Sequence, residues 1–543
     1  MKKCLIILVY ILYGTSFVIA QQQNTTKLVV GIVVDQMREE YLYRFHDQYS
    51  ENGFKRLMRE GFNCRNAHYN YIPTVTGAGH ASIYTGTVPR YHGIVGNDWY
   101  DRQLKKKIYC VDDSTEQLVG LDSLKKGASP KNLLATNLGD ELKISTNLKA
   151  KVISISFKDR AAILPAGHMA DAAYWVDHQS GKFITSTFYM QKLPGWVTDF
   201  NQQKKADYYL GQTWALLKPE TEYPLSLADD NNYEGKFKGK DKPVFPYNLK
   251  ELSASNKPLF DMLYNSPFAD DLLTDFVVEA IKQENLGKGS YPDLLAISYS
   301  STDAVGHKFG PLSKEINDMY LRLDLDIARL LETLDQLVGK GNYTVFLTAD
   351  HGVAENTKYL ADHKVPTGTL LMDSLKKDAS LFLNKRLGVG KWIEAAMNNQ
   401  FYLNRSLIET KGLKLEEVQN RLADYLRNKT GIAEVYTASQ LEQQDYTQYL
   451  SLRIKNGFYY KRSGDIMIVT EPAWTDNYEA ATHGVGYTYD THVPLILFGA
   501  GIHRGESFEH YNITDLAPTI SMILKIKLPN ACIGDPIIKA IGE

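Results

Sequence analysis

A short buried strand that runs directly into polar residues constrains this chain more than any other feature. In residues 343–352, YTVFLTADHG, the apolar and β-branched run over 344–348 is typical of a buried parallel strand, and it ends in Asp350, His351 and Gly352. Neighbouring side chains on a strand point to opposite faces, so Asp350 and His351 can bind one ion only where the backbone is already turning. Gly352 permits that turn. The stretch alone is equally consistent with a capping aspartate and a surface histidine.

Similar strand-like runs recur along the chain, and most of them end in a polar group. They lie at 27–34, 151–157, 293–299 and 493–498. The first three lead in turn to Asp35, to Lys158 and Arg160, and to Asp303. Helical patterns lie between them, such as 314–338, which Gly339 is predicted to end. This alternation predicts an α/β fold with a mainly parallel central sheet and helices on both faces, and such sheets bind ligands beyond the carboxyl ends of their strands.

Length and composition bound the domain organisation and the partners. The chain has 543 residues and 44% hydrophobic content, which suits one large α/β domain over 21–543 with cap segments inserted at about 165–290 and 356–475. The second insertion contains the helical pattern LKLEEVQNRLADYLRN and is predicted to cover the site. A formal net charge of −2 provides no field that would recruit nucleic acid or an anionic membrane, so small-molecule partners are expected. The oligomeric state stays open.

The N-terminus has the pattern of a targeting segment. Lys2 and Lys3 precede an apolar run that ends in small residues at Val18 and Ala20, which predicts a signal peptide over residues 1–20. The alternative is an uncleaved anchor, but the run is shorter than the ~20 residues that span a bilayer. Secretion across the inner membrane to the periplasm is therefore expected, without stable membrane insertion.

The cysteines suit an exported protein only in part. Cys4 leaves with the signal peptide, so that Cys64, Cys110 and Cys532 remain, an odd number for an oxidising compartment. One disulfide and one buried thiol is the simplest expectation. The sequence leaves open which pair forms.

Two further stretches supply candidate metal ligands. Asp303 and His307 stand four residues apart in STDAVGH, a spacing that puts both on one face of a helical turn. His483 precedes a glycine that frees the backbone to turn the imidazole inward, although it could equally be a surface histidine. Together with the strand ends these residues form two ligand sets: Asp35, Asp350 and His351 for one ion, and Asp303, His307 and His483 for the other. Such mixed carboxylate and imidazole ligands suit two Zn²⁺ ions, with manganese, iron or cobalt as alternatives.

Residues 71–86, YIPTVTGAGHASIYTG, supply a candidate nucleophile. Thr76 lies at the expected start of a helix, where backbone N–H groups and the helix dipole favour a bound anion. It could instead be a simple helix N-cap. Next to a zinc ion that lowers its pKa, its hydroxyl would become an alkoxide able to attack phosphorus.

Seven motifs in order give these residues a common interpretation. They are VDQM at 34–37, TVTGAGHASIYTG at 74–86, GIVGNDWY at 93–100, KDRAAILPAGH at 158–168, STDAVGH at 301–307, TADHGV at 348–353 and THGVGYTYDTHVP at 482–494. In these motifs the chain resembles the PafA-type branch of the alkaline phosphatase superfamily. The resemblance implies a periplasmic two-zinc phosphomonoesterase that acts on small phosphate esters.

The resemblance also implies a role for each site residue. Thr76 is the nucleophile and a ligand of the zinc held by Asp35, Asp350 and His351. Asp303, His307 and His483 bind the zinc that faces the leaving group. Asn97, Lys158 and Arg160 contact the phosphoryl oxygens, and the reaction passes through a phosphothreonine in two in-line steps.

The charge of the substrate agrees with these roles. A monoester dianion carries one more negative charge than a diester, and the cations Lys158 and Arg160 match it. The nearest alternative is a phosphodiesterase or nucleotide pyrophosphatase with the same two-metal site. A sulfatase is less favoured because no Cys or Ser in a C/S-x-P-x-R setting lies near position 76. A catalytically inactive binding protein would be expected to have lost ligands.

Overall fold

Five parallel strands form the centre of the fold. The computed structural model describes residues 26–475 and 479–542. Within them, the middle of the large sheet has the order β14 (Tyr343–Thr348), β1 (Leu28–Val34), β13 (Asp293–Tyr299), β8 (Val152–Ser156) and β9 (Ala172–Val176), all parallel. Every residue of β1 is buried, because strands on both sides and helices on both faces cover it. The predicted α/β class is confirmed.

The strand register brings the candidate site residues to one edge of the sheet. Val34 pairs with Tyr299, and Val33 pairs with Thr348, so the carboxyl ends of β1, β13 and β14 are level. The residues that follow these strands therefore emerge together, as predicted for a parallel sheet.

Most of the outer strands of the sheet pair antiparallel. On one side β22 (Leu495–Gly499) pairs antiparallel with β14 and is followed outward by β2 (Phe62–Cys64) and β23 (Gly505–Ser507), which pair parallel with each other. On the other side β10 (Phe183–Ser186) and β6 (Asp112–Val119) continue the sheet, and β7 (Lys126–Ala128) ends it. The run at 493–498 thus forms a strand but runs opposite to the central series. An apolar run indicates burial and does not encode direction.

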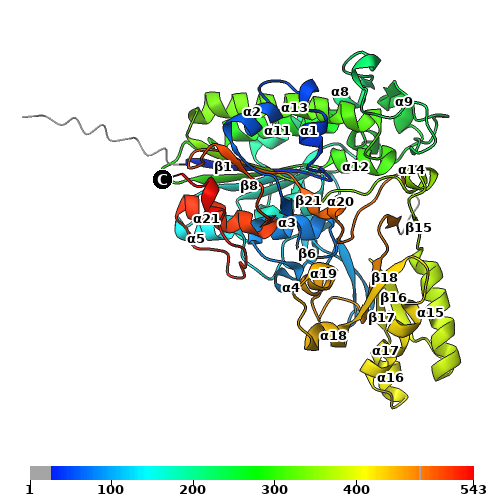
Figure 1. Ribbon diagram of the computed structural model, residues 1–543. Coiled ribbons are helices and arrows are strands. Elements are labelled where there is room, and N and C mark those ends of the chain that lie inside the picture. The colour runs from blue at the N-terminus through cyan, green and yellow to red at the C-terminus, as the bar shows by residue number, and fades with distance from the viewer. Residues whose placement is uncertain (1–25, 476–478, 543) are drawn as a thin grey trace, which may run out of the picture.

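Helices cover both faces of the sheet (Figure 1). α13 (Lys314–Leu334) and α11 (Phe268–Gln283) lie on one face, and α3 (Thr76–Thr85) and α21 (Leu516–Leu524) lie on the other. The helix predicted over 314–338 continues past α13 as a π-helical turn, and Gly339 ends it with a φ of +105°.

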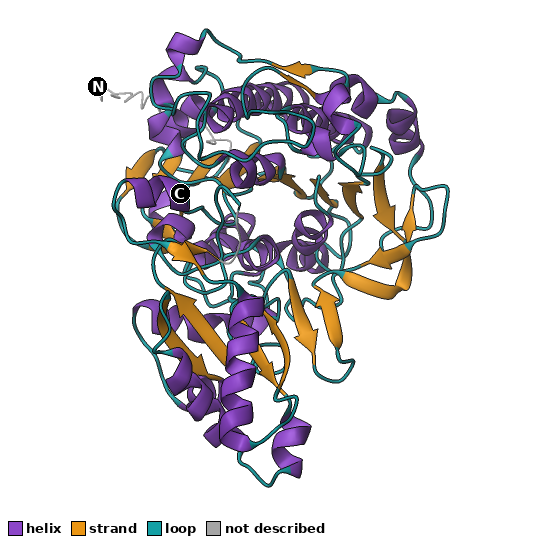
Figure 2. Cartoon of the chain, turned by 90° about the vertical axis from the view of Figure 1, so that its right-hand side faces the viewer, coloured by secondary structure: helices purple, strands orange, loops and turns teal. Residues whose placement is uncertain are grey.

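Most of the range 356–475 builds a separate lobe, seen at the lower right of Figure 1 and at the bottom of Figure 2, whereas α14 (Thr357–Asp362) lies above it against Tyr233. Its four-stranded sheet has the order β16 (Ile393–Met397), β17 (Gln400–Leu403), β19 (Ile466–Thr470) and β18 (Ile432–Thr437). Helices α15 (Met372–Leu387) and α17 (Leu415–Leu426) pack on it around their own hydrophobic core. The Asn398 amide donates 2.7 Å to the carbonyl of Asp98, beside Asn97, which links the lobe to the site.

The range 165–290 contributes more to the core than the sequence suggests. It contains β9 and β10 of the large sheet and the covering helix α11. The segment that stands outside the sheet is correspondingly shorter. Its polar stretch at 229–243 forms surface loops without a helix or strand.

The expectation of a disulfide is wrong. Cys64, Cys110 and Cys532 are all free. Cys64 lies in β2, Cys110 packs near the start of α3, and the Cys532 thiol packs against Gly86 at the far end of that helix. The three thiols therefore sit in different parts of the molecule. Burial raises the pKa of the Cys64 thiol to about 12, which makes it unreactive.

Two expectations concern the relation to a membrane. Among the helices of residues 26–475 and 479–542, none combines the length and the apolar character needed to cross a bilayer. The signal peptide predicted over residues 1–20 lies outside the described residues.

Candidate active site and metal centres

Two groups of potential metal ligands converge at the carboxyl edge of the central strands. In the described part of the chain, the groups are Asp35, Asp350 and His351, and Asp303, His307 and His483. Within each group the ligand atoms all lie within 4.8 Å of one another. The structure therefore brings together the same two sets that the sequence predicts.

The first group is completely buried and fits a cation. Asp35 follows β1, and Asp350 and His351 follow β14. His351 Nε2 lies 3.4 Å from Asp35 Oδ1 and 3.5 Å from Asp350 Oδ2, yet none of these three atoms has a hydrogen-bond partner. Buried polar atoms are nearly always paired, so three facing orphan atoms of this chemistry suit a divalent transition metal.

The orientation of His351 is fixed by its backbone neighbour. Its Nδ1 donates 3.0 Å to the carbonyl of Gly352, which leaves Nε2 free as a ligand. A Cβ on Gly352 would lie 2.2 Å from the Tyr489 carbonyl oxygen, and Gly352 N donates 2.7 Å to the Asp490 carbonyl. Glycine is thus required here for close packing, since its φ lies outside the left-handed region.

The second group combines one helical turn with a distant loop. Asp303 and His307 lie on α12 (Ser301–Phe309), with His307 Nε2 3.2 Å from Asp303 Oδ1. His483 Nε2 lies 3.2 Å from His307 Nε2 and 3.5 Å from Asp303 Oδ1. Each histidine donates from Nδ1 to a carbonyl at 2.8 Å, His307 to Ala481 and His483 to Thr74. Both Nε2 lone pairs therefore face Asp303, an arrangement that a shared cation stabilises.

The two groups are neighbours. The rings of His351 and His483 are stacked with centroids 3.5 Å apart. Lys158 also links the groups, because its Nζ lies 2.7 Å from Asp35 Oδ2 and 2.6 Å from Asp303 Oδ2. Burial alone would lower the pKa of the Lys158 ammonium, but Asp303 and Asp35 outweigh it and raise that pKa above its ordinary value.

Thr76 is the first residue of α3, and its side chain does not cap the helix. The N-cap position belongs to Val75, so the simple N-cap interpretation of Thr76 does not hold. Thr76 Oγ1 instead accepts from Lys158 Nζ at 3.5 Å and from Arg160 Nη2 at 3.4 Å. A buried hydroxyl is therefore held between two cations at the N-terminus of a ten-residue helix, where an anion is favoured.

Arg160 and Asn97 complete the surroundings of Thr76. Arg160 Nη1 donates 3.1 Å to the Tyr109 hydroxyl, which in turn donates 2.5 Å to Asp159 Oδ1. The Asn97 side-chain oxygen accepts from Gly77 N at 2.8 Å. This contact directs the Asn97 NH₂ group, with its two donors, away from Gly77.

Several residues that support the site were missed by the sequence reasoning. Gln36 connects the two groups, because its Nε2 donates 2.6 Å to Asp303 Oδ1 and its backbone N donates 3.2 Å to Asp350 Oδ1. Asp490 accepts from the backbone N–H groups of Gly484 at 2.7 Å and Val485 at 2.8 Å, and so fixes the loop that carries His483. Gln36 and Asp490 both lie inside the seven motifs of the sequence analysis. Membership in these motifs was the one sequence feature that could have identified them as site residues.

Three histidines to which the sequence analysis assigns no role lie in different settings. His80 is buried beside the first group, where Nδ1 donates 2.9 Å to the Thr76 carbonyl and lies 3.4 Å from Asp350 Oδ2. His92 pairs with Ser82 at 2.9 Å, and His168 pairs with Asp140 at 3.0 Å, both away from the ligand groups. Only His80 among these three therefore supports the site.

A glycine in α3 provides a test of this packing. A Cβ on Gly79 would lie 2.4 Å from the Asp350 carbonyl oxygen. We expect Gly79→Ala to displace Asp350, to reduce bound metal, and to lower kcat/KM by about tenfold or more. Metal analysis and steady-state kinetics measure both effects. Gly195→Ala is the matched control, because its Cβ would meet nothing within 4 Å, and it should behave as the unmodified protein.

Comparison with known proteins supplies relatives over nearly the whole chain. The type I phosphodiesterase/nucleotide pyrophosphatase family matches residues 29–492. The chain is 44% identical over 529 residues to a calcium-transporting ATPase of Myroides odoratus, with 96% of both chains covered. It is 42% identical over 530 residues to alkaline phosphatase PafA of Elizabethkingia meningoseptica, also with 96% of both covered. It is 42% identical over 513 residues to alkaline phosphatase PhoV of Synechococcus elongatus, with 94% of this chain and 92% of PhoV covered.

The fold is shared with a solved relative. The crystal structure of wild-type PafA superposes with a TM-score of 0.92 at 42% identity. The match covers 95% of this chain and 99% of PafA.

Proposed function

This chain belongs to the type I phosphodiesterase/nucleotide pyrophosphatase family, and from that premise we propose that it is a phosphate monoester hydrolase of the alkaline phosphatase type. The observation that carries the proposal is the position of Thr76 Oγ1, 3.5 Å from Lys158 Nζ and 3.4 Å from Arg160 Nη2, beside two groups of metal ligands. Relatives named alkaline phosphatase at 42% identity support it.

Two divalent metal ions, most suitably zinc, belong to this proposal. Asp35, Asp350 and His351 would hold one ion next to Thr76, and Asp303, His307 and His483 would hold the other. When bound, such ions act as Lewis acids that stabilise negative charge on the attacking and leaving oxygens. The donor chemistry fits this role, because both groups offer imidazoles and carboxylates and the first has three orphan buried atoms.

The side chains of the protein supply the nucleophile and position the phosphoryl group of the substrate. Thr76 Oγ attacks phosphorus, the bond to the alcohol oxygen breaks, and the phosphoryl group is carried on Thr76 until water releases it as phosphate. Lys158, Arg160 and the amide of Asn97 bind the phosphoryl oxygens. Because Arg160 is held by Tyr109 and Lys158 by two carboxylates, these donors are preorganised before the substrate arrives.

The preference for monoesters rests on Lys158 and Arg160. We expect the double change Lys158→Ala and Arg160→Ala to cost monoester hydrolysis ~2–5 kcal/mol of transition-state stabilisation. Diester hydrolysis should fall much less, because a diester lacks the extra charge. The ratio of kcat/KM for matched mono- and diesters measures this difference, which is about tenfold for each 1.4 kcal/mol.

The control for this variant is Lys126→Ala, which removes a half-exposed lysine paired with Asp112 far from Thr76 in the sequence. It should leave the ratio unchanged. Equal losses for both ester classes in the double variant would mean that the pair serves folding or metal placement, and the phosphodiesterase alternative would then be favoured.

Export belongs to the proposal as well. The charged and apolar pattern over residues 1–20 supports cleavage near Gln21 and a periplasmic location. Fractionation of cells that express the full chain, with N-terminal sequencing of the mature protein, tests it. ATP belongs in the substrate panel, because one relative carries the name of an ATPase.

A further inference from the structure

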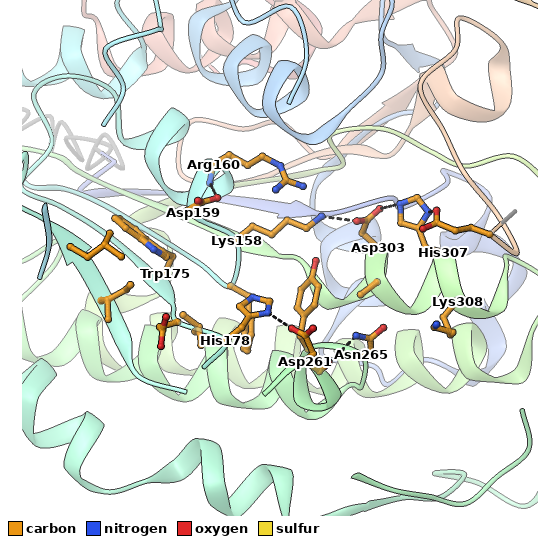
Figure 3. Close-up of a pocket in the computed structure, with 18 residues that line it drawn as sticks. Lys158, Asp159, Arg160, Trp175, His178, Asp261, Asn265, Asp303, His307 and Lys308 are labelled. Carbon is orange, nitrogen blue, oxygen red and sulfur yellow. Dashed lines mark hydrogen bonds and ion pairs between the residues drawn. The ribbon is translucent and has the colours of Figure 1, made fainter. Parts of the chain in front are cut away.

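A large cavity extends from the proposed phosphoryl site. Its volume is about 590 Å³, and one side is lined by Lys158, Arg160, Asp303 and His307 (Figure 3). Asp303 and His307 belong to the ligand group assigned to the leaving-group side. In an in-line displacement the leaving oxygen points away from the nucleophile. An alcohol that departs from a phosphoryl group between Thr76 and Asp303 would therefore enter this cavity.

The cavity has aromatic walls. Trp175 lies at one side, and His178 lies between Trp175 and Lys308 (Figure 3). Phe157 and Tyr264 also line the cavity. The rings of Phe157 and Tyr264 are stacked with centroids 5.3 Å apart, and those of His178 and Tyr264 lie 5.0 Å apart. Packed rings present a fixed surface on which a flat or ring-shaped group can stack.

The polar groups in the cavity are held in place. His178 Nδ1 and Asp261 Oδ1 are 2.7 Å apart, and both residues are partly exposed to the cavity. The Asn265 amide donates 2.8 Å to the Asp261 carbonyl. A preorganised imidazole–carboxylate pair can accept and donate hydrogen bonds to hydroxyl groups without reordering.

The charge of the walls is unbalanced beyond the phosphoryl-binding groups. Three carboxylates line that part of the cavity, against the single ammonium of Lys308: Asp159, Asp177 and Asp261. Asp177 is partly compensated by Lys125 Nζ at 3.4 Å, and Glu479 lies instead beside the ligand group, 3.0 Å from His307 Nδ1. A second anionic group on the substrate would meet these carboxylates at close range in a partly desolvated space. Uncharged alcohols avoid this repulsion.

We propose that this cavity is the binding site for the alcohol portion of the substrate, and that it selects monoesters of uncharged, hydroxyl-bearing ring alcohols. Sugar phosphates and nucleoside monophosphates share this chemistry. The ring stacks on Trp175 and Tyr264, and its hydroxyl groups bond to the His178–Asp261 pair. The inference rests on the proposed function, because it concerns the specificity of the same reaction.

The test compares four substrates: ethyl phosphate, glucose 1-phosphate, glucuronic acid 1-phosphate and AMP. Each variant is compared with the unmodified protein on the same substrate, so intrinsic reactivity cancels. His178→Ala and Trp175→Ala should each lower kcat/KM for glucose 1-phosphate or AMP about tenfold more than for ethyl phosphate. A larger loss of kcat/KM for glucose 1-phosphate identifies a sugar as the preferred alcohol, and a larger loss for AMP identifies a nucleoside.

A second pair of substrates tests whether the cavity disfavours a negatively charged alcohol group. Glucuronic acid 1-phosphate differs from glucose 1-phosphate by one carboxylate, and we expect the unmodified protein to hydrolyse it roughly tenfold less efficiently. Asp177→Asn combined with Asp261→Asn should reduce this difference by about fivefold. The control is His46→Ala, which removes the histidine of an exposed His–Asp pair outside the cavity and should change none of the ratios.

The possible results distinguish failure of the alcohol-binding proposal from failure of the proposed function. If ethyl phosphate is hydrolysed but both His178→Ala and Trp175→Ala lower all substrates equally, the cavity does not bind the alcohol. If Trp175→Ala fails to fold, His178→Ala alone decides this point, because His178 is partly exposed. If the unmodified protein hydrolyses no monoester, the proposed function itself fails.

Discussion

Replacing Thr76 by alanine is expected to lower kcat/KM for phosphate monoesters by roughly three to six orders of magnitude. The reason is that Thr76 Oγ1 is the hydroxyl that Lys158 and Arg160 both contact at the N-terminus of α3. The loss should appear in kcat, while metal content stays near two ions, because the six carboxylate and imidazole side chains of the two groups are untouched. Steady-state kinetics together with metal analysis measures both quantities.

Thr76→Ser is the matched variant. It keeps the hydroxyl and removes only a methyl group, so much of the activity should remain. Acid quenching during turnover should trap a phosphoryl group on the peptide that contains residue 76 in the unmodified and Ser proteins. A phosphoenzyme in the Ala variant with undiminished turnover would identify another nucleophile.

Removing metal with a chelator is expected to abolish hydrolysis and to lower the melting temperature, and zinc should restore both. Asp35 and Asp350 explain the stability effect. Burial raises the pKa of each of these carboxyl groups, and Asp35 raises that of Asp350 further, so without metal the charged forms of both groups are disfavoured away from water. An ion at a thousand times its Kd contributes about 4 kcal/mol to the free energy of unfolding.

The measurement is calorimetry or thermal melting of chelated and zinc-reloaded protein, with elemental analysis of each sample. His503→Ala is a suitable control, since His503 belongs to neither ligand group and should leave metal content unchanged. Full hydrolysis by a sample shown to be metal-free would overturn the assignment of both groups.

The sequence alone determined the central strands and the residues that follow them. Buried parallel strands are continuous apolar runs, so β1, β13 and β14 were visible as such, and the polar residue at the end of each run marked the edge of the sheet. The ligand sets followed from residue chemistry and from the four-residue spacing of Asp303 and His307 within one helical turn.

Only the tertiary structure decided the features that depend on contacts between distant segments. Apolar periodicity carries no direction, so the antiparallel pairing of β22 with β14 could not be foreseen. The separation of Cys64, Cys110 and Cys532 depends on where β2 and α3 lie in the fold. The number of cysteines in the sequence gives no information about the distances between their thiols.

The same limit applies to the site itself. Thr76 as helix N-cap and Thr76 as nucleophile share one local sequence pattern, and the choice depends on Lys158 and Arg160 reaching its oxygen from another strand end. The cavity beyond Lys158 combines residues from the segment that follows β8 and from β9, α10 (Asp261–Tyr264) and α12, so its shape and charge exist only once the sheet has formed. Local sequence specifies which groups are present, whereas long-range packing sets the distances at which they act.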